Sequence, residues 1–165
     1  MGYRATADRL PVQALFDLKG PRDALVAWCG DSVPALPAQP NYRHDANNVT
    51  VAHLGPGHWM VRAPVAAEDS LATALRPDAA PPEISIVCVS DTLAFFRIHG
   101  PDADKLMAIG SPLDLHPGAF PEAGASFTEF FSLRALVMRA PGGFDLAVEQ
   151  SLGPFVADCL ARALR

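Results

Sequence analysis

The sequence predicts an α+β fold made by duplication, in which two β-α-β-β-α units form one domain. Residues 14–30 and 94–110 both run from an apolar-alternating stretch through Gly-Pro to a second glycine (ALFDLKGPRDALVAWCG and AFFRIHGPDADKLMAIG). Residues 49–64 and 134–150 both have the pattern of a strand, a tight turn and a return strand. The composition, 50% hydrophobic and 19% charged, is that of a globular domain rather than a disordered chain.

The repeated segment predicts a strand followed by a helix. Leu15 and Asp17 belong to an apolar-polar alternation that is typical of a strand with one buried face. Pro21 suits the first turn of a helix, and Gly30 suits its end. The second copy repeats this arrangement, with Gly110 in the place of Gly30.

Each copy continues with a hairpin and a second helix. Pro56-Gly57 and Pro141-Gly142-Gly143 supply the turns. The first helix is expected at about 66–76, ended by Pro77. The last helix is expected to begin near Ser151, and its apolar stripe is Phe155, Cys159, Leu160 and Leu164.

The joint between the copies is expected in the Pro-rich segment 76–83, and a strand at 84–89 opens the second half. The repeats therefore span about 12–76 and 84–165. Because halves of this size bury little surface alone, residues 1–165 are expected to form a single domain. Residues 31–47 are expected to lie extended on the surface, and the first eight residues are expected to be mobile.

Composition excludes several functional classes. The net charge is −5 and only two of thirteen basic residues are lysines, so nucleic-acid binding is not expected. No apolar run reaches the roughly 20 residues of a membrane span. The first residues lack the apolar core of a signal peptide. Three distant cysteines (Cys29, Cys88 and Cys159) are expected to be buried and reduced, which favours the cytoplasm.

No catalytic or metal-binding residue is predicted from the residues alone. The five histidines (His44, His53, His58, His99 and His116) have no metal-ligand spacing, and half-exposed strand histidines explain His53 and His58 better. Ser111, Asp114 and His116 are close in sequence, but triads assemble from distant segments. Asp114 is expected to be a turn carboxylate bound to local backbone.

Residues 93–125 include the loop Pro112-Leu113-Asp114-Leu115-His116-Pro117, followed by Ala119-Phe120-Pro121. This segment resembles the gamma subunit of heterotetrameric sarcosine oxidase. Residues 54–64 (LGPGHWMVRAP) resemble that family's hairpin, with Trp59 as its anchor. Phe144-Asp145-Leu146 and Ser151 resemble its last strand and the start of its last helix, so the resemblance runs from about residue 12 to 164.

The gamma subunit in turn is similar to the folate-binding domain of the aminomethyltransferase (T-protein) of glycine cleavage. Asp114 matches that family's catalytic aspartate, which makes it a weak candidate for cofactor binding. Two departures weaken this assignment: Leu113 replaces an asparagine, and residues 124–138 are expected to pass directly into the next strand. The C-terminal domains that close the folate pocket in that family are not expected here either.

The resemblance implies a non-catalytic gamma subunit in a complex that demethylates sarcosine oxidatively, giving glycine, hydrogen peroxide and formaldehyde or methylene-tetrahydrofolate. It places FAD, FMN, NAD, tetrahydrofolate and zinc on alpha, beta and delta partner subunits. Dimethylglycine or another N-methyl amine is as compatible as sarcosine. Phe95-Phe96 and Phe130-Phe131 are candidates for an exposed apolar interface. The alternatives are a stand-alone folate-binding, aminomethyltransferase-like one-carbon protein and a homodimeric scaffold.

Overall fold

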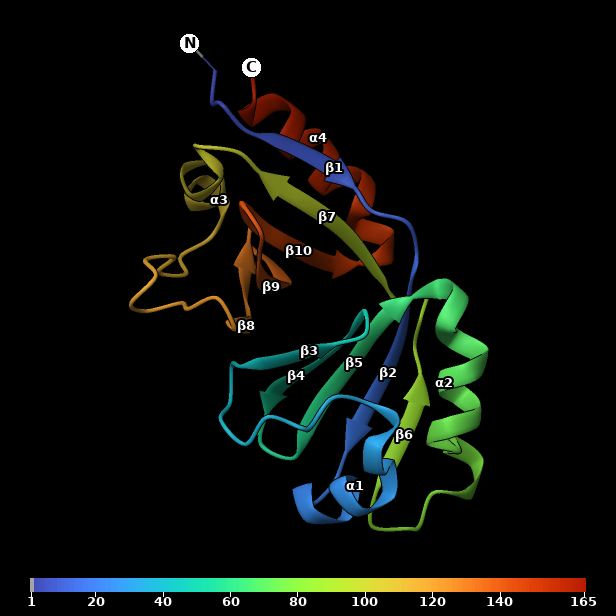
Figure 1. The fold of residues 1–165 in the computed structure, drawn as a ribbon. Helices are drawn as coiled ribbons and strands as arrows, with labels where there is room; N and C mark the ends of the chain where they lie inside the picture. Colours follow the sequence, from blue (N-terminus) through green and yellow to red (C-terminus); the bar gives the residue numbers. More distant parts are fainter. Residues whose placement is uncertain (1) are drawn as a thin grey trace. The chain divides into compact units, whose positions relative to one another are not determined.

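Within residues 2–165, which the computed structural model describes, the chain forms two compact units, each with a five-stranded antiparallel sheet and two α-helices (Figure 1). The central unit comprises Val12–Asp91, and the terminal unit comprises Met1–Pro11 and Thr92–Arg165. The α+β class is confirmed, and each unit contains the expected β-α-β-β-α core with further strands. That the chain acts as one domain stays a prediction.

The sheet of the central unit has the strand order β3-β4-β5-β2-β6. Side chains of its inner strands pack with those of two helices around Phe16 and Trp59, which are nearly inaccessible to solvent. Its elements are β2 (Gln13–Lys19), α1 (Arg22–Cys29), η1 (Gly30–Ser32), β3 (Arg43–Ala46), β4 (Val49–Gly55), β5 (His58–Pro64), η2 (Val65–Ala67), α2 (Glu68–Leu75), η3 (Pro77–Ala79) and β6 (Ser85–Cys88).

The sheet of the terminal unit has the equivalent order β1-β7-β10-β9-β8. Its core gathers around Phe96 and Phe144, with Val156 and Leu160 from the last helix. Its elements are β1 (Thr6–Arg9), β7 (Leu93–His99), α3 (Ala103–Gly110), β8 (Ala125–Phe130), β9 (Leu133–Ala140), β10 (Gly143–Glu149), η4 (Gln150–Leu152) and α4 (Gly153–Ala163).

Each unit takes one edge strand from the other half of the sequence. β1 precedes β2 in the chain but pairs with β7, whereas β6 precedes β7 but pairs with β2. The two registers match, because Thr6 lies opposite His99 and Ser85 lies opposite Lys19, the equivalent position in the first copy. The duplicated sequence therefore folds with its first strands exchanged between the halves.

Two glycines allow the exchanged segments to pass close to the Gly-Pro turns. A Cβ atom on Gly20 would lie 2.7 Å from the carbonyl oxygen of Glu83, and one on Gly100 would lie 2.6 Å from that of Arg4. Both glycines also have positive φ values (138° and 123°), which side chains disfavour. The helices begin after the prolines, so the Gly-Pro pairs mark the close approach of two segments as well as helix starts.

Asp102 links the N-terminal segment to the start of α3. Its Oδ2 accepts hydrogen bonds from the backbone amide of Arg4 (3.0 Å) and from Arg4 Nε (3.2 Å). Its Oδ1 accepts one from Lys105 Nζ (2.7 Å). The Lys105 hydrogen bond, followed by that of the Arg4 amide, lowers the pKa of Asp102 to about 2. The ionised carboxylate therefore holds the segment that leads into β1.

Several local expectations are confirmed and others are wrong. Both predicted hairpins form, as β4–β5 and β9–β10. The first eight residues are not wholly mobile, because β7 offers an edge with which β1 pairs. The segment 31–47 is not simply extended on the surface, because it buries Val33 and Leu36 and ends in β3. The segment 124–138 does not pass directly into one strand, since it forms β8 and β9 around a tight turn.

Some predicted exposures and helix positions differ too. In α4 the buried stripe contains Val156 and Leu160, whereas Phe155 is 51% exposed, because the helix begins at Gly153 and turns that residue outward. Ser151 lies in η4 before α4 and donates to Glu149 instead of capping the helix. Gly110 is the last residue of α3 and lies against the ring of Phe130, where a side chain would collide.

The expected environments of cysteines and phenylalanines need correction as well. Cys29 is buried as expected, but Cys88 is exposed and Cys159 is partly exposed. Phe95, Phe96 and Phe130 are buried, and Phe131 packs partly buried against the core of the terminal unit. These phenylalanines therefore form no exposed patch. No helix among residues 2–165 is long and apolar enough to cross a membrane.

Asp102→Asn tests the link between the N-terminal segment and α3. The pKa of Asp102 in the folded protein, about 2, lies below its ordinary value of about 4. Its stabilising contribution is therefore complete above pH about 4 and is lost as the pH falls towards about 2. We expect the variant to be less stable than the parent in urea unfolding at pH about 7, with a difference that shrinks below pH about 4.

Asp104→Asn is the matched control, because Asp104 is an exposed carboxylate in the first turn of the same helix. It should leave the acid dependence of stability unchanged. A difference between Asp102→Asn and the parent that has the same size at both ends of this pH range would contradict the assignment.

Candidate functional site

The loop between α3 and β8 carries the sequence-predicted candidate, Asp114. The loop begins at the buried Ser111 and ends near Phe120, which is also buried. Leu113 and Leu115 pack against the core of the terminal unit, so the intervening Asp114 is directed outward and is exposed. The alternation of apolar and polar residues thus places one face of the loop on the core and the other in solvent.

The polar groups of the loop bind its own backbone. Asp114 Oδ1 accepts a hydrogen bond from the backbone amide of His116 (2.9 Å), as expected for a turn carboxylate. His116 Nδ1 accepts one from the Gly118 amide (3.1 Å), and Ser111 Oγ accepts one from the Leu113 amide (3.3 Å). These contacts do not link the three side chains of the loop into the relay that a Ser-His-Asp triad needs.

Arg139 on β9 holds the loop in place and was missed in the sequence analysis. Its guanidinium donates to the carbonyl oxygens of Phe120 (2.7 and 3.0 Å) and Leu115 (2.6 Å). It also lies over the rings of Phe120 and Phe144, with Cζ 5.6 and 4.8 Å from their centroids. An arginine on a strand gives no sequence signal for this role, because its partners are backbone carbonyls of a distant loop.

Asp114 does not lie in the enclosed polar pocket that a folate would need. The carboxylate is exposed, and one of its oxygens is committed to the His116 amide. A carboxylate that orients a ligand nitrogen works in a water-excluded site. The residues at Asp114 therefore do not fit tetrahydrofolate, and we assign no catalytic or cofactor-binding role to Asp114.

His58 and His44 each contact a different group of the chain. His58 Nε2 bonds Asp17 Oδ1, and Asp17 Oδ2 pairs with Lys19 Nζ (2.8 Å). His44 Nδ1 donates to the carbonyl oxygen of Ala35 (2.6 Å). No group of three or more His, Cys, Asp or Glu side chains within residues 2–165 is placed to hold a metal ion.

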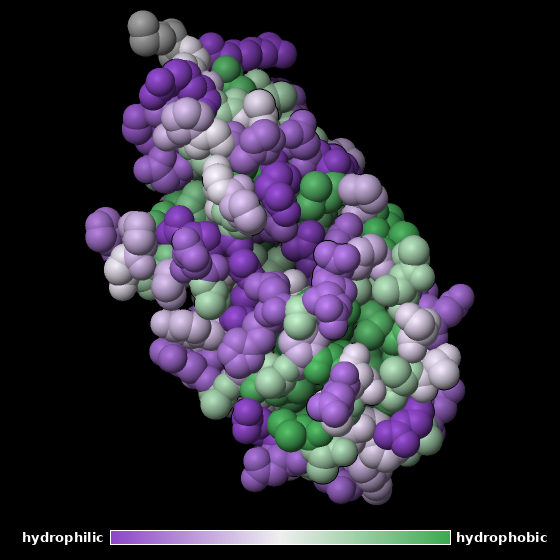
Figure 2. Space-filling model, viewed as in Figure 1, coloured by the Kyte–Doolittle hydropathy of each residue, from purple (hydrophilic) through white to green (hydrophobic). Residues whose placement is uncertain are grey.

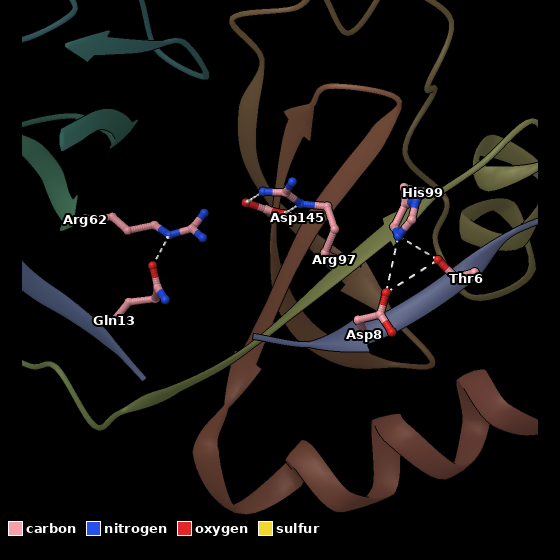
Figure 3. Close-up of polar contacts among 7 residues, drawn as sticks. All are labelled: Thr6, Asp8, Gln13, Arg62, Arg97, His99 and Asp145. Carbon is pink, nitrogen blue, oxygen red and sulfur yellow. Dashed lines mark hydrogen bonds and ion pairs between the residues drawn. The ribbon is translucent and has the colours of Figure 1, made fainter. Parts of the chain in front are cut away.

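His99 has a hydroxyl and a carboxylate beside it (Figure 3). Thr6 Oγ1 lies 2.7 Å from His99 Nε2, and Asp8 Oδ2 lies 3.2 Å from the same nitrogen. A nucleophile relay needs the two partners on opposite nitrogens of the ring, so that the acid orients the base. The geometry instead ties β1 to β7, since Thr6 and His99 are cross-strand partners.

An ion pair between Arg97 and Asp145 lies next to His99 on the same sheet face (Figure 3). Asp145 is only 4% exposed, and Arg97 Nε and Nη2 both donate to its carboxylate. This hydrogen bonding raises the pKa of Arg97. In the central unit Arg62 Nε donates to Gln13 Oε1 (3.1 Å). Because these groups bind one another, they act as cross-strand links in the two sheets.

A stacked pair lies in the core of the central unit. The rings of His53 and Trp59 are 4.4 Å apart at 20°, and Trp59 Nε1 donates to the carbonyl oxygen of Pro37 (2.9 Å). His53 is 7% exposed, and within the described residues its Nδ1 is the buried side-chain atom without a hydrogen-bond partner. The expectation of a half-exposed His53 is therefore wrong, since a stack on Trp59 buries it.

No protein-family model matches the sequence, and no curated protein matches it. Solved structures do share its fold. One is a chain of a heterotetrameric sarcosine oxidase from Corynebacterium sp. U-96, with a TM-score of 0.78 and 23% identity over 100% of this chain and 88% of that chain. Another is the aminomethyltransferase T of the glycine cleavage system from Bartonella henselae, with a TM-score of 0.68 and 14% identity over 95% of this chain but 45% of that chain. The predicted fold is thereby confirmed, as is the predicted likeness in fold to a chain of a heterotetrameric sarcosine oxidase and to an aminomethyltransferase.

Arg139→Met should release the loop, because it removes hydrogen bonds to two carbonyl groups while retaining an apolar stem. We expect a loss of about 2–4 kcal/mol in the free energy of unfolding. We also expect faster proteolysis within residues 112–119, measured by mass spectrometry of the fragments. The matched control is Arg134→Met, since Arg134 is exposed and stacks on Phe127 of the neighbouring strand. Equal effects of the two substitutions would exclude a specific role for Arg139.

His53→Phe should keep the stack on Trp59 while removing the unpartnered nitrogen. We expect stability to be unchanged or higher by up to about 1 kcal/mol in urea unfolding. His44→Phe is the comparison, because it removes the bond to Ala35 and should lower stability by about 0.5–1.5 kcal/mol. A clear loss of stability in His53→Phe would mean that Nδ1 has a bound partner.

Proposed function

We propose that this chain is a non-catalytic, gamma-type subunit of a cytoplasmic heterotetrameric sarcosine oxidase. The observation that carries the proposal is the match of the whole chain to most of one chain of such an oxidase. The aminomethyltransferase, in contrast, is matched over less than half of its length. The match thus spans 88% of a chain of the oxidase and 45% of the aminomethyltransferase, which supports the first likeness over the second.

The chemistry of the side chains supports a packing role. Asp114, His99 and Arg97 each bind groups of the chain itself, so none of them is presented as an acid, base or nucleophile. The proposal places FAD, FMN, NAD, tetrahydrofolate and zinc on alpha, beta and delta partner subunits. Those subunits would oxidise the N-methyl group of sarcosine, and this chain would complete their assembly.

Co-expression tests the proposal. We expect the tagged chain to elute with candidate alpha, beta and delta subunits as one assembly, with the native mass of a heterotetramer and a flavin absorbance spectrum. A colourless chain that elutes alone beside well-folded partners would contradict the proposal.

Asp114→Ala separates this proposal from a stand-alone folate-binding protein. In the assembled oxidase the substitution should leave the flavin content and the rate of sarcosine oxidation unchanged, because Asp114 accepts a hydrogen bond from the backbone of its own loop. Titration of the isolated parent chain with tetrahydrofolate should show no saturable binding. Saturable binding that Asp114→Ala abolishes would favour the one-carbon protein instead.

A further inference from the structure

The segment between α1 and β3 has a repeat of three residues. Residues 33–41 read VPA, LPA and QPN, with proline in the middle of each triplet. In the first two triplets the first residue is buried and the third is exposed. The buried residues are Val33 and Leu36, and the exposed ones are Ala35 and Ala38. A period of three residues is that of a polyproline II helix, which proline favours. We call residues 33–38 the proline strap.

The backbone of the proline strap agrees with this conformation. Within the described chain, residues 34–38 belong to no helix or strand and make no backbone–backbone hydrogen bond. A polyproline II helix has no internal hydrogen bonds, so its carbonyl groups can accept bonds from elsewhere. In Figure 1 the segment leads from α1 across the sheet of the central unit to β3, and Figure 2 shows hydrophobic and hydrophilic residues side by side over that part. The strap is therefore not held by a ladder of backbone bonds.

Three consecutive carbonyl groups of the strap each accept a hydrogen bond from a side chain of a different element. The pairs are His44 Nδ1 with Ala35 O (2.6 Å), Arg22 Nη2 with Leu36 O (2.8 Å) and Trp59 Nε1 with Pro37 O (2.9 Å). The donors belong to β3, α1 and β5. Successive carbonyl groups of a helix with three residues per turn point in different directions, which explains why three elements supply the donors. We call the three donor side chains the strap site.

The strap site has the composition of sites that bind polyproline II segments between proteins. Such sites are lined by aromatic rings, and they bind an extended segment that is already formed and loses little conformational entropy. The indole of Trp59 packs in one core cluster with Val33 and Leu36, and the ring of His53 stacks on it with the centroids 4.4 Å apart. This environment therefore suits a segment in which an apolar residue, a proline and a small residue follow one another.

Release of the strap would break no strand pairing of the central unit. The strap supplies no strand to the order β3-β4-β5-β2-β6. It is attached by the three side-chain hydrogen bonds and by the packing of Val33 and Leu36. Segments held without a backbone ladder open locally at a lower free energy than the strands of a sheet. Such an opening would uncover Trp59, which is 2% exposed while the strap is in place.

We propose that the proline strap is a resident ligand of the strap site, and that a proline-rich segment of a partner protein replaces it when the strap opens. The partner segment repeats the triplet of an apolar residue, proline and a small residue, and its carbonyl groups accept the hydrogen bonds from Arg22, His44 and Trp59. Because only the open fraction of the chain can bind, the strap lowers the apparent affinity for the partner. The strap is thus an autoinhibitory contact, and this inference does not depend on the identity of any complex.

A peptide with the strap's own sequence tests the site on the full chain. The probe is fluorescein-labelled VPALPAQP, and the control peptide VAALAAQA lacks the prolines. Leu36→Ser removes a buried anchor of the strap and leaves the three donors in place. We expect this variant to bind the probe at least about tenfold more tightly than the parent does, measured by fluorescence anisotropy. Ala35→Ser is the matched control, because Ala35 is the exposed neighbour of Leu36, and it should bind the probe as the parent does.

A second substitution locates the bound peptide. Arg22→Met, added to Leu36→Ser, removes one donor of the strap site and should weaken binding at least about fivefold. Arg134→Met is the control in the same background, because Arg134 lies on β9 of the terminal unit. Circular dichroism and urea unfolding establish that each variant is folded. Val33→Ser, which removes the other buried anchor of the strap, replaces Leu36→Ser if that variant does not fold.

Local opening is measured separately in the parent chain. Elastase cleaves after small residues, so Ala35 and Ala38 make the strap a substrate when it is released. The rate of cleavage within residues 33–38, followed by mass spectrometry, should rise with urea less steeply than global unfolding does. A local opening exposes less surface than unfolding of the whole chain, which is the reason for the smaller slope.

The outcomes that overturn the proposal are distinct. No saturable binding of VPALPAQP to a folded Leu36→Ser variant would exclude a proline-rich partner at this site. Equal binding of the two peptides would mean that the prolines are not recognised. Cleavage of the strap with the slope of global unfolding would exclude local opening. Dimers of the parent that Leu36→Ser abolishes would make the strap of a second copy the occupant. None of these experiments uses flavin-containing subunits, so this proposal and the oxidase proposal can fail independently.

Discussion

The exchange of first strands is the constraint on which the fold depends. β1 completes the sheet that the second repeat begins, and β6 completes the sheet of the first repeat. Neither contiguous half of the sequence therefore holds a whole sheet. Antiparallel pairing between segments about 90 residues apart (β1 and β7) and about 70 residues apart (β2 and β6) has to offset a large loop-closure entropy. The close passage at Gly20 and Gly100 lets these pairings form without steric collision.

The two units have equivalent strand orders but different charged side chains on their sheets. Asp17 and Lys19 on β2 occupy the positions of Arg97 and His99 on β7, yet their cross-strand partners differ. Asp17 binds His58 on the adjacent strand β5 and pairs with Lys19 on its own strand. Arg97 and His99 bind groups on the adjacent strands β10 and β1. The charges thereby stabilise each unit, and the two copies share a fold while the partners of their charged side chains differ.

The loop at Asp114 is held by contacts within the terminal unit. Leu113 and Leu115 pack one face of the loop against the core. Arg139 donates hydrogen bonds to the carbonyl oxygens of Leu115 and Phe120. Asp114 stabilises the turn by accepting a hydrogen bond from the backbone amide of His116. This role needs only a short side chain with a polar acceptor atom, and it involves no ligand. An aspartate can thus stabilise a turn in this loop, whereas the same residue type can act as an acid or base in the enclosed pocket of an enzyme.

The sequence by itself determined the elements that depend on local patterns: the Gly-Pro strand-helix units, the hairpins with turns at Gly57 and Gly142, and the turn role of Asp114. It also indicated the duplication, because internal similarity is visible without contacts. Only the tertiary structure decided that β1 and β6 exchange partners, that His53 stacks on Trp59, and that Arg139 holds a distant loop. These features join residues far apart in the chain, and neither propensity nor periodicity carries information about which distant group will satisfy a strand edge or a carbonyl.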